Sequence, residues 1–141
     1  MNKIFINGME FFAFHGHYDE EKVAGNKFLV DLTLWSDTSL AEKTDNLDDA
    51  LNYQIAYALV KEVITNTKSN LLENIAANIL KVLFDEYKNL PKAKITIKKV
   101  SPPMGGQIAA VGVKIKGKRE DYKVPKVPKV PRVPKVPRAM R

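Results

Sequence analysis

The sequence predicts an α+β fold, in which a four-stranded antiparallel sheet carries two helices on one face. Three observations support this prediction. Four segments alternate apolar and polar residues with a period of two, which is typical of half-buried strands. Two segments repeat apolar residues at helical spacing, and the order of segments is β-β-α-α-β-β. Because each strand would bury one face only, we expect both helices on that face.

The first two strands are predicted in the N-terminal part. Residues 3–14 alternate around Gly8, which indicates a strand with a bulge or a close backbone approach. Residues 15–26 are polar and contain glycines, and they predict a loop. Residues 27–37 place apolar side chains at alternate positions from Phe28 to Leu34. They predict a second strand, antiparallel to the first.

Two amphipathic helices are predicted after a polar stretch. Ser39 and Glu42 have the spacing of a capping box, which predicts a short helical turn. Residues 55–64 and 72–83 each repeat apolar side chains every three or four positions. Each of these two segments therefore predicts a helix, and residues 67–70 form the break between them.

The last two strands are predicted at residues 94–99 and 108–116, joined by a Ser-Pro-Pro-Met-Gly-Gly turn. A sheet of four strands has two open edges, and an open edge can pair with another copy of the chain. The residues alone leave two alternatives of equal weight. One is assembly into a ring or barrel, and the other is a monomer with short, charged edge strands.

The C-terminal segment differs in composition from the rest of the chain. Val-Pro recurs every third residue from Val124 to Pro137. Proline at this spacing fixes φ and removes backbone donors, so it predicts an extended polyproline II segment or a disordered chain. We expect a domain over residues 1–121 and a basic Val-Pro repeat tail over residues 122–141.

The formal charge of +7 lies in this tail. Seven basic residues and no acidic ones follow Tyr122, so the first 122 residues balance sixteen basic against sixteen acidic side chains. The balance argues against nucleic acid as a partner of the domain. The partner of the tail stays open between a polyproline-binding groove, an anionic membrane, nucleic acid or acidic protein, and no selected role.

Composition also limits the chemistry. With no cysteine in the chain, disulfides, iron–sulfur clusters and thiolate zinc sites are excluded. His15 and His17 cannot form a zinc site without carboxylates, so no metal is expected. No apolar run reaches the roughly 20 residues of a membrane-spanning helix, and the N-terminus alternates, unlike a signal peptide. A cytoplasmic protein without membrane contact is the expectation.

Several short motifs, in order along residues 3–119, resemble the dihydroneopterin aldolase family. They are His15-Gly16, Glu21, Gly25, Thr44-Asp45-Asn46, Asn52-Tyr53, Leu71-Leu72-Glu73 and Lys99-x-x-Pro102-Pro103. The resemblance implies a tunnelling-fold subunit, whose relatives form barrels from rings of subunits. For this chain it implies a homo-oligomer, an octamer with active sites between neighbouring chains.

The resemblance also implies an activity. Members of the family cleave 7,8-dihydroneopterin by a retro-aldol reaction to 6-hydroxymethyl-7,8-dihydropterin and glycolaldehyde in folate synthesis. They use no metal or organic cofactor. Many members also epimerise the substrate side chain at its 2′ carbon through the same intermediate.

Glu73 is the pterin anchor that the resemblance implies, with Leu72 beside it in the binding site. A pterin presents a ring N–H next to an exocyclic amine, and an ionised carboxylate offers two parallel acceptors to this pair of donors. The residues alone favour another reading. Asn70 and Glu73 have capping-box spacing, so Glu73 could cap its own helix.

Lys99 corresponds to the catalytic lysine of the family. The dihydropterin has a C=N bond next to the C–C bond that breaks, so it provides its own electron sink. A lysine nearby needs only to stabilise charge or deliver a proton at that ring nitrogen. Without the resemblance, Lys99 would be a solvated residue at a strand end, and the sequence alone could not choose between it and the neighbouring Lys98 and Lys94.

Tyr53 and Glu21 complete the implied site. Tyr53 would bind substrate and share proton transfer with Lys99, although the residues alone equally allow an aromatic side chain packed at a helix start. Glu21 would contact the substrate's side chain and orient Lys99, and its alternative is an acidic, solvated loop. His15 is expected to make structural hydrogen bonds. His17 stands where relatives often have a small or apolar residue, which bears on substrate preference.

Two other functions remain in competition. The first is an epimerase that acts on dihydroneopterin triphosphate, but a triphosphate would require several basic groups converging on the site. The second is a non-catalytic pterin-fold module whose proline-rich tail binds a partner.

Overall fold

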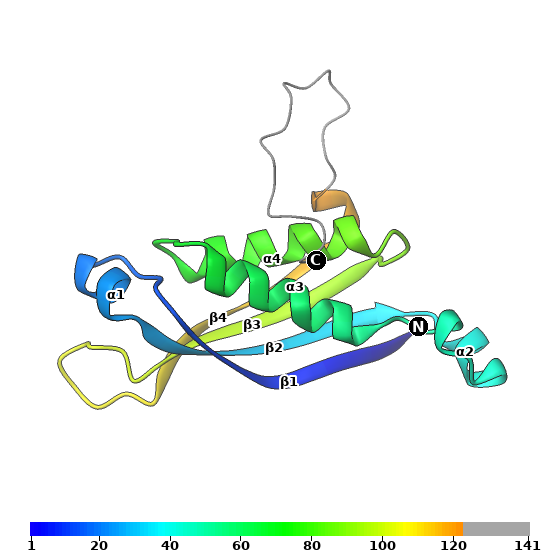
Figure 1. The fold of residues 1–141 in the computed structure, drawn as a ribbon, viewed down its shortest axis with the longest axis horizontal. Helices are drawn as coiled ribbons and strands as arrows, with labels where there is room; N and C mark the ends of the chain where they lie inside the picture. The colour runs from blue at the N-terminus through cyan, green and yellow to red at the C-terminus, as the bar shows by residue number, and fades with distance from the viewer. Residues whose placement is uncertain (123–141) are drawn as a thin grey trace, which may run out of the picture.

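The computed structural model describes residues 1–122 and joins four strands into one antiparallel sheet (Figure 1). The strands are β1 (Asn2–Ala13), β2 (Asn26–Ser36), β3 (Lys92–Val100) and β4 (Ala110–Lys118). They pair in the order β1-β2-β3-β4, so neighbours in sequence are neighbours in the sheet. β1 and β4 are therefore the two edges of the sheet.

The two long helices lie side by side on one face of the sheet (Figure 1). They are α3 (Tyr53–Asn66) and α4 (Leu72–Glu86), separated by the break at Thr67–Leu71. α3 and α4 run antiparallel to each other (Figure 1). The predicted fold class and the order β-β-α-α-β-β are confirmed.

The loop predicted at residues 15–26 is wrong in part, because it contains a short helix, α1 (Asp19–Ala24). Six residues are too few for an apolar period to appear in the sequence. The signals present were the acidic residues in the first turn, which suit the positive end of a helix, and the glycine that follows. Gly25 ends the helix with φ of 83°, and its N–H donates to the carbonyl oxygen of Glu21 at 2.9 Å.

The short helical turn predicted near Ser39 is present as α2 (Ser39–Thr44), followed by the 3-10 turn η1 (Leu47–Asp49). The predicted capping residue is wrong by one position. Thr38 precedes the helix, and its hydroxyl donates to Glu42 Oε2 at 2.5 Å. Ser39 instead hydrogen-bonds Asp37.

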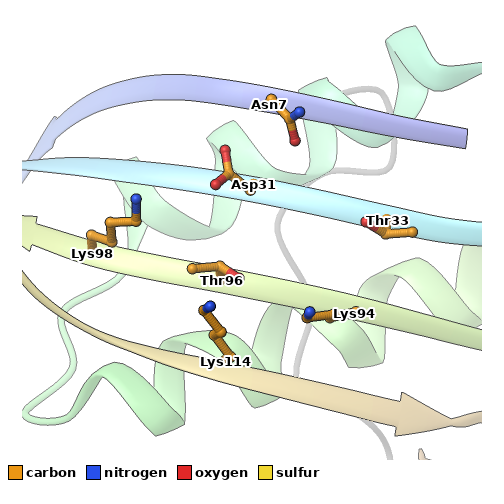
Figure 2. A pocket seen from close by; sticks show the side chains of 7 residues that line it. All are labelled: Asn7, Asp31, Thr33, Lys94, Thr96, Lys98 and Lys114. Carbon is orange, nitrogen blue, oxygen red and sulfur yellow. The ribbon is translucent and has the colours of Figure 1, made fainter.

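The alternation of each strand gives the sheet one apolar face and one open polar face. Gly8, with φ of 71°, lies in the predicted bulge of β1, where the register with β2 shifts. Its N–H donates to Asp31 Oδ1 at 2.7 Å. Figure 2 shows part of the open face, where Thr96 and Lys98 of β3 project away from the helices.

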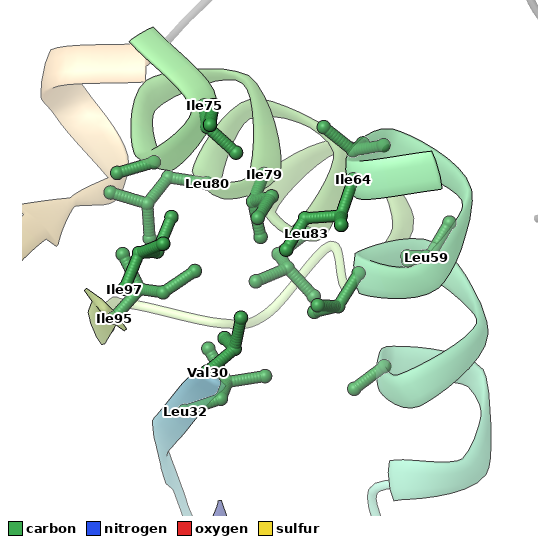
Figure 3. Packing of buried hydrophobic residues seen from close by; sticks show 14 of the residues in the cluster. Val30, Leu32, Leu59, Ile64, Ile75, Ile79, Leu80, Leu83, Ile95 and Ile97 are labelled. Atoms are coloured by element: carbon green, nitrogen blue, oxygen red, sulfur yellow. The ribbon is translucent and has the colours of Figure 1, made fainter. Parts of the chain in front are cut away.

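The core lies between the apolar sheet face and the two helices (Figure 3). Side chains from β2 and β3 meet side chains from α3 and α4, and the largest of them are fully buried. These include Leu32, Leu59, Ile64, Ile75, Ile79, Leu80, Leu83, Ile95 and Ile97. This packing holds the helix ends in a constant position over the sheet, which is what the site described below requires.

The C-terminal end of the described chain is the 3-10 turn η2 (Arg119–Tyr122). The Arg119 guanidinium donates to the carbonyl oxygens of Leu90, at 2.8 Å, and of Phe84 and Tyr87. Tyr122 stacks on Phe84, with ring centroids 5.4 Å apart. The packed part of the chain therefore includes Tyr122. The conformation expected for the Val-Pro repeats falls on residues outside the described range.

His15 ties the end of β1 to the helix layer. Its Nε2–H donates to the Ile64 carbonyl at 2.7 Å, and its Nδ1 accepts from the Ser69 N–H at 2.9 Å. The ring is 1% exposed and meets Phe28 edge-on. Burial lowers the pKa of His15; the Ile64 carbonyl opposes this effect and the charge of Lys99 adds to it. The predicted structural role of His15 is thus confirmed by its hydrogen bonds.

We expect this imidazole to make stability depend on pH. Protonation removes the Nδ1 acceptor, and the unfolded chain accepts the proton more readily because the folded-state pKa lies below 6.5. The stabilisation from neutral His15 is complete above that unfolded value and is lost as pH falls from there through the folded-state pKa. His15→Asn should lower the free energy of unfolding at pH 7 by about 1–3 kcal/mol and flatten its pH dependence below 6.5.

Urea unfolding between pH 5 and pH 8 measures both effects. His17→Asn is the matched control, because His17 is exposed and should keep the wild-type slope. Equal slopes in the wild type and in His15→Asn would contradict the assignment.

Candidate active site

A nearly buried ion pair joins β3 to α1. Lys99 Nζ lies 2.7 Å from Glu21 Oε2, and the side chains are 14% and 8% exposed. The alternation of β3 places Lys99 on the helix side, in line with the buried Ile97, and Lys98 on the open face. The structure thereby separates two adjacent lysines that the sequence left equal, and only Lys99 meets a carboxylate.

The carboxylate of Glu21 is held from several directions. A Cβ on Gly16 would lie 2.5 Å from Glu21 Oε1, so only glycine lets this side chain lie against the backbone. Burial alone would raise the pKa of Glu21. The hydrogen bond from Lys99, the backbone N–H of Tyr18 and the charge of Lys99 outweigh burial, so the pKa lies below its usual value. Glu21 is therefore ionised at neutral pH, and the solvated-loop alternative is wrong for this residue.

The α1 segment is fastened to the connection between α3 and α4. The Gly16 N–H donates to the Ser69 carbonyl at 2.9 Å, and Lys22 Nζ donates to Asn70 Oδ1 at 2.5 Å. These contacts bring the ion pair to the same end of the sheet as the first turn of α4 (Figure 1). The sequence showed no local signal for them, because the partners lie about fifty residues apart.

Glu73 lies at this end as the second residue of α4. Leu71 precedes the helix and makes no side-chain cap, while Asn70 is engaged by Lys22. The predicted alternative of a capping box between Asn70 and Glu73 is therefore wrong. Glu73 is exposed and, over residues 1–122, has no hydrogen-bond or ion-pair partner. Leu72 is half-buried against the core, so the helix start is held in place while the carboxylate is available to a ligand.

Tyr53 lies at the opposite end of the helix layer. It is the first residue of α3, and the carbonyl of the preceding Asn52 accepts from the Tyr87 hydroxyl, just beyond the end of α4. A helix of this length spans about 20 Å, so Tyr53 and Lys99 of one chain lie far apart. Tyr53 is 57% exposed, which does not fit the alternative of an aromatic side chain packed on the sheet.

The remaining polar groups add little to the chemistry at this end. His17 is exposed, and its ring contacts Tyr18. No three His, Asp or Glu side chains of residues 1–122 are placed to hold a metal ion together. None of the helices in that range is both long and apolar enough to span a membrane.

Comparisons with known proteins identify the family. The family model described as dihydroneopterin aldolase matches residues 4–116. The dihydroneopterin aldolase of Streptococcus pyogenes serotype M3 is 36% identical over 119 residues, which cover 84% of this chain and all of the relative. That of Staphylococcus epidermidis is 37% identical over 112 residues, 79% of this chain and 93% of the relative.

A solved structure agrees with these relatives. The fold is similar to that of Escherichia coli dihydroneopterin aldolase in complex with neopterin, with a TM-score of 0.77 and 26% identity. The match covers 83% of this chain and 99% of the other. The family match spans the strands and helices that carry Glu21, Glu73 and Lys99. The chain belongs to the dihydroneopterin aldolase family.

Proposed function

We propose that this chain cleaves 7,8-dihydroneopterin by a retro-aldol reaction to 6-hydroxymethyl-7,8-dihydropterin and glycolaldehyde, a step of folate synthesis. The observation that carries the proposal is the buried Lys99–Glu21 pair, at the end of the sheet where Glu73 presents an unpaired carboxylate. The neopterin complex of the Escherichia coli enzyme supports a pterin as ligand.

Glu73 would bind the pterin ring. Its two oxygens can accept from the ring N–H and the exocyclic amine together, which fixes both the position and the orientation of the ring. The first turn of α4 favours a negative charge at this position, where residues 1–122 supply no cationic partner. Leu72 would supply an apolar contact beside the ring.

Lys99 would act at the reacting end of the substrate. The hydroxyl on the far carbon of the scissile bond loses its proton to solvent by way of Tyr53, and the C–C bond breaks to release glycolaldehyde. The bonding pair forms a double bond to the ring carbon, and the C=N pair moves onto the ring nitrogen. Protonation of the side-chain carbon, with loss of the proton from that nitrogen, then gives 6-hydroxymethyl-7,8-dihydropterin. An ammonium near that nitrogen can stabilise the charge and donate a proton. Glu21 would position Lys99, through the 2.7 Å contact, and would contact the hydroxyls of the substrate's side chain.

Tyr53 would come from a neighbouring copy of the chain. Within one chain it is roughly a helix length from Lys99, and it is exposed where another subunit could meet it. Open edges on β1 and β4 provide a way for copies to join into a ring. This arrangement fits the homo-oligomer of eight chains that the family resemblance implies, with each site shared between neighbours.

The triphosphate epimerase is the weaker candidate. Both lysines described near Glu21 are engaged, Lys99 by Glu21 itself and Lys22 by Asn70. The other lysines of the sheet lie largely on the open face, away from this site. Cleavage is thus the main activity proposed, with epimerisation at the 2′ carbon as a side reaction. The tail beyond Tyr122 would take no part in either reaction.

We expect the purified full chain to release glycolaldehyde from 7,8-dihydroneopterin and not from its triphosphate. Glycolaldehyde can be measured by reduction coupled to an alcohol dehydrogenase. The same samples should show no requirement for added metal. Failure to release glycolaldehyde from either substrate would overturn the aldolase assignment, and turnover of the triphosphate alone would transfer it to the epimerase.

Two substitutions should divide binding from catalysis. Glu73→Gln removes the charge and one acceptor, so it should raise KM about 10- to 100-fold with a smaller effect on kcat. Lys99→Ala should lower kcat by about 10²- to 10⁴-fold. Steady-state kinetics on dihydroneopterin measures both.

Matched controls exist in the same elements. Glu86→Gln removes a charge from the far end of α4, and Lys98→Ala removes the adjacent lysine, which faces the other side of the sheet. Both should leave kcat and KM within about twofold of wild type. Similar, mild losses in Glu73→Gln and Lys99→Ala would favour structural roles for both residues.

Mixing two inactive variants tests the shared site. Tyr53→Phe and Lys99→Ala chains are unfolded together and reassembled at equal amounts. If each site takes Tyr53 from one chain and Lys99 from its neighbour, about a quarter of the sites receive both residues unchanged. The mixture should therefore recover about a quarter of the wild-type activity. Reassembly of each variant alone is the control. No recovery in an assembled mixture would contradict the contribution of Tyr53 by a neighbour.

A further inference from the structure

The open face of the sheet concentrates positive charge. Six lysines of β3 and β4 share this face, as the register of the two strands shows. They are Lys92, Lys94, Lys98, Lys114, Lys116 and Lys118. Residues 1–122 as a whole balance basic and acidic side chains, so this concentration is a segregation of charge and not a consequence of composition.

The lysines are arranged at a cost in stability. Lys94 lies directly opposite Lys116. Lys92 lies directly opposite Lys118. Like charges directly opposite one another destabilise a strand pair. Within the described part of the chain, none of the six ammonium groups makes an ion pair with a carboxylate. A polar face that only needed to be soluble would interleave both signs, and the β3 and β4 part of this face carries lysines without any acidic residue.

A hollow lies in the middle of this charged face (Figure 2). Its volume is about 320 Å³, and Lys94, Thr96 and Lys98 of β3 line it along one strand, with Lys114 beside them on β4. Asn7, Asp31 and Thr33 form the side nearer β1. The carboxylate of Asp31 already accepts a hydrogen bond from the N–H of Gly8 through its Oδ1. Three lysines against one carboxylate leave the hollow positively charged.

We propose that this hollow binds a small anion that carries phosphate groups. Ammonium groups on flexible stems bind phosphate as point charges, and threonine hydroxyls and an asparagine amide can donate to the remaining oxygens. A bound phosphate would also relieve the repulsion between the lysines. The volume is at the lower end of the range for ligand pockets, which suits inorganic phosphate or a short polyphosphate.

The site is distinct from the one proposed for the pterin. Lys98 and Lys99 are adjacent in β3 and project to opposite faces, so the sheet itself separates the two sites. A single-stranded nucleic acid is the alternative that the test must separate, because such strands stack bases on exposed aromatic rings and Phe5, opposite Thr33 on this face, is 64% exposed. Trp35 on this face is already covered by Lys3, Lys92 and Lys116, whose amino groups lie 5.4, 4.5 and 5.7 Å from the ring centroid.

Calorimetric titration of the full chain with phosphate, pyrophosphate and tripolyphosphate, at an ionic strength fixed with sodium chloride, tests the proposal. The double variant K94Q/K114Q removes two lysines of the hollow. The control K61Q/K81Q removes the same charge from the exposed surfaces of α3 and α4. We expect saturable binding to wild type, weakened about tenfold or more in K94Q/K114Q and less than about twofold in the control. The basic tail is common to all three proteins.

Thermal unfolding gives an independent readout. Without phosphate and at low salt, K94Q/K114Q should have a Tm equal to or above that of wild type, because a repulsion has been removed. Added phosphate should raise the Tm of wild type and of the control, and not that of K94Q/K114Q. Glycolaldehyde release should be the same in all three proteins.

Three results would overturn the proposal. The first is the absence of saturable binding to wild type beyond the effect of chloride. The second is equal weakening in K94Q/K114Q and in K61Q/K81Q, which would reduce the effect to net charge. The third is binding of a single-stranded oligonucleotide, lost in K94Q/K114Q, without binding of any of the three phosphates.

Discussion

The ion pair between Lys99 and Glu21 is the interaction on which the rest of the site depends. A charge taken out of water is costly, and either side chain left alone in this position would be an uncompensated, nearly buried ion. The pair therefore requires α1 to fold at the position from which Glu21 reaches β3. It also requires glycine at residue 16, because any Cβ there would occupy the space of the carboxylate.

The packing around this pair converts a local contact into a constant geometry. His15 hydrogen-bonds the end of α3 and the break before α4, and the Gly16 N–H binds the same break. These hydrogen bonds fix the first turn of α4, which carries Glu73, in position relative to β3, which carries Lys99. The roles proposed for Glu73 and Lys99 require a constant separation between the carboxylate and the ammonium, and this framework provides it.

Alternation in the sequence predicted much of the fold, because apolar faces on four strands and two helices allow few arrangements. It identified the bulge at Gly8 as well. It missed α1, whose six residues are too short to show a period. The spacing of Asn70 and Glu73 also favoured a capping box, as the alternative to a ligand-binding Glu73, and this box does not form. That error is physical, because the amide of Asn70 is taken by Lys22, a contact between distant segments that local spacing does not reveal.

The site was predictable to different degrees. The family resemblance selected Glu21, Glu73 and Lys99, and the structure brings all three to one end of the sheet. The resemblance also selected Tyr53. It did not predict that Tyr53 lies far from Lys99 within one chain, because the residues alone do not give the direction of α3 over the sheet. The net charge of residues 1–122 did not predict the lysine-rich open face, because a net charge contains no information about the face to which each side chain projects.

A structure of the chain with neopterin bound tests the central claim most directly. The account predicts that the Glu73 carboxylate contacts the ring N–H and exocyclic amine together, and that Lys99 Nζ lies within hydrogen-bonding distance of the ring nitrogen next to the side chain. Tyr53 of a neighbouring copy should close the same site. A pterin bound elsewhere, or one that contacts neither Glu73 nor Lys99, would contradict it.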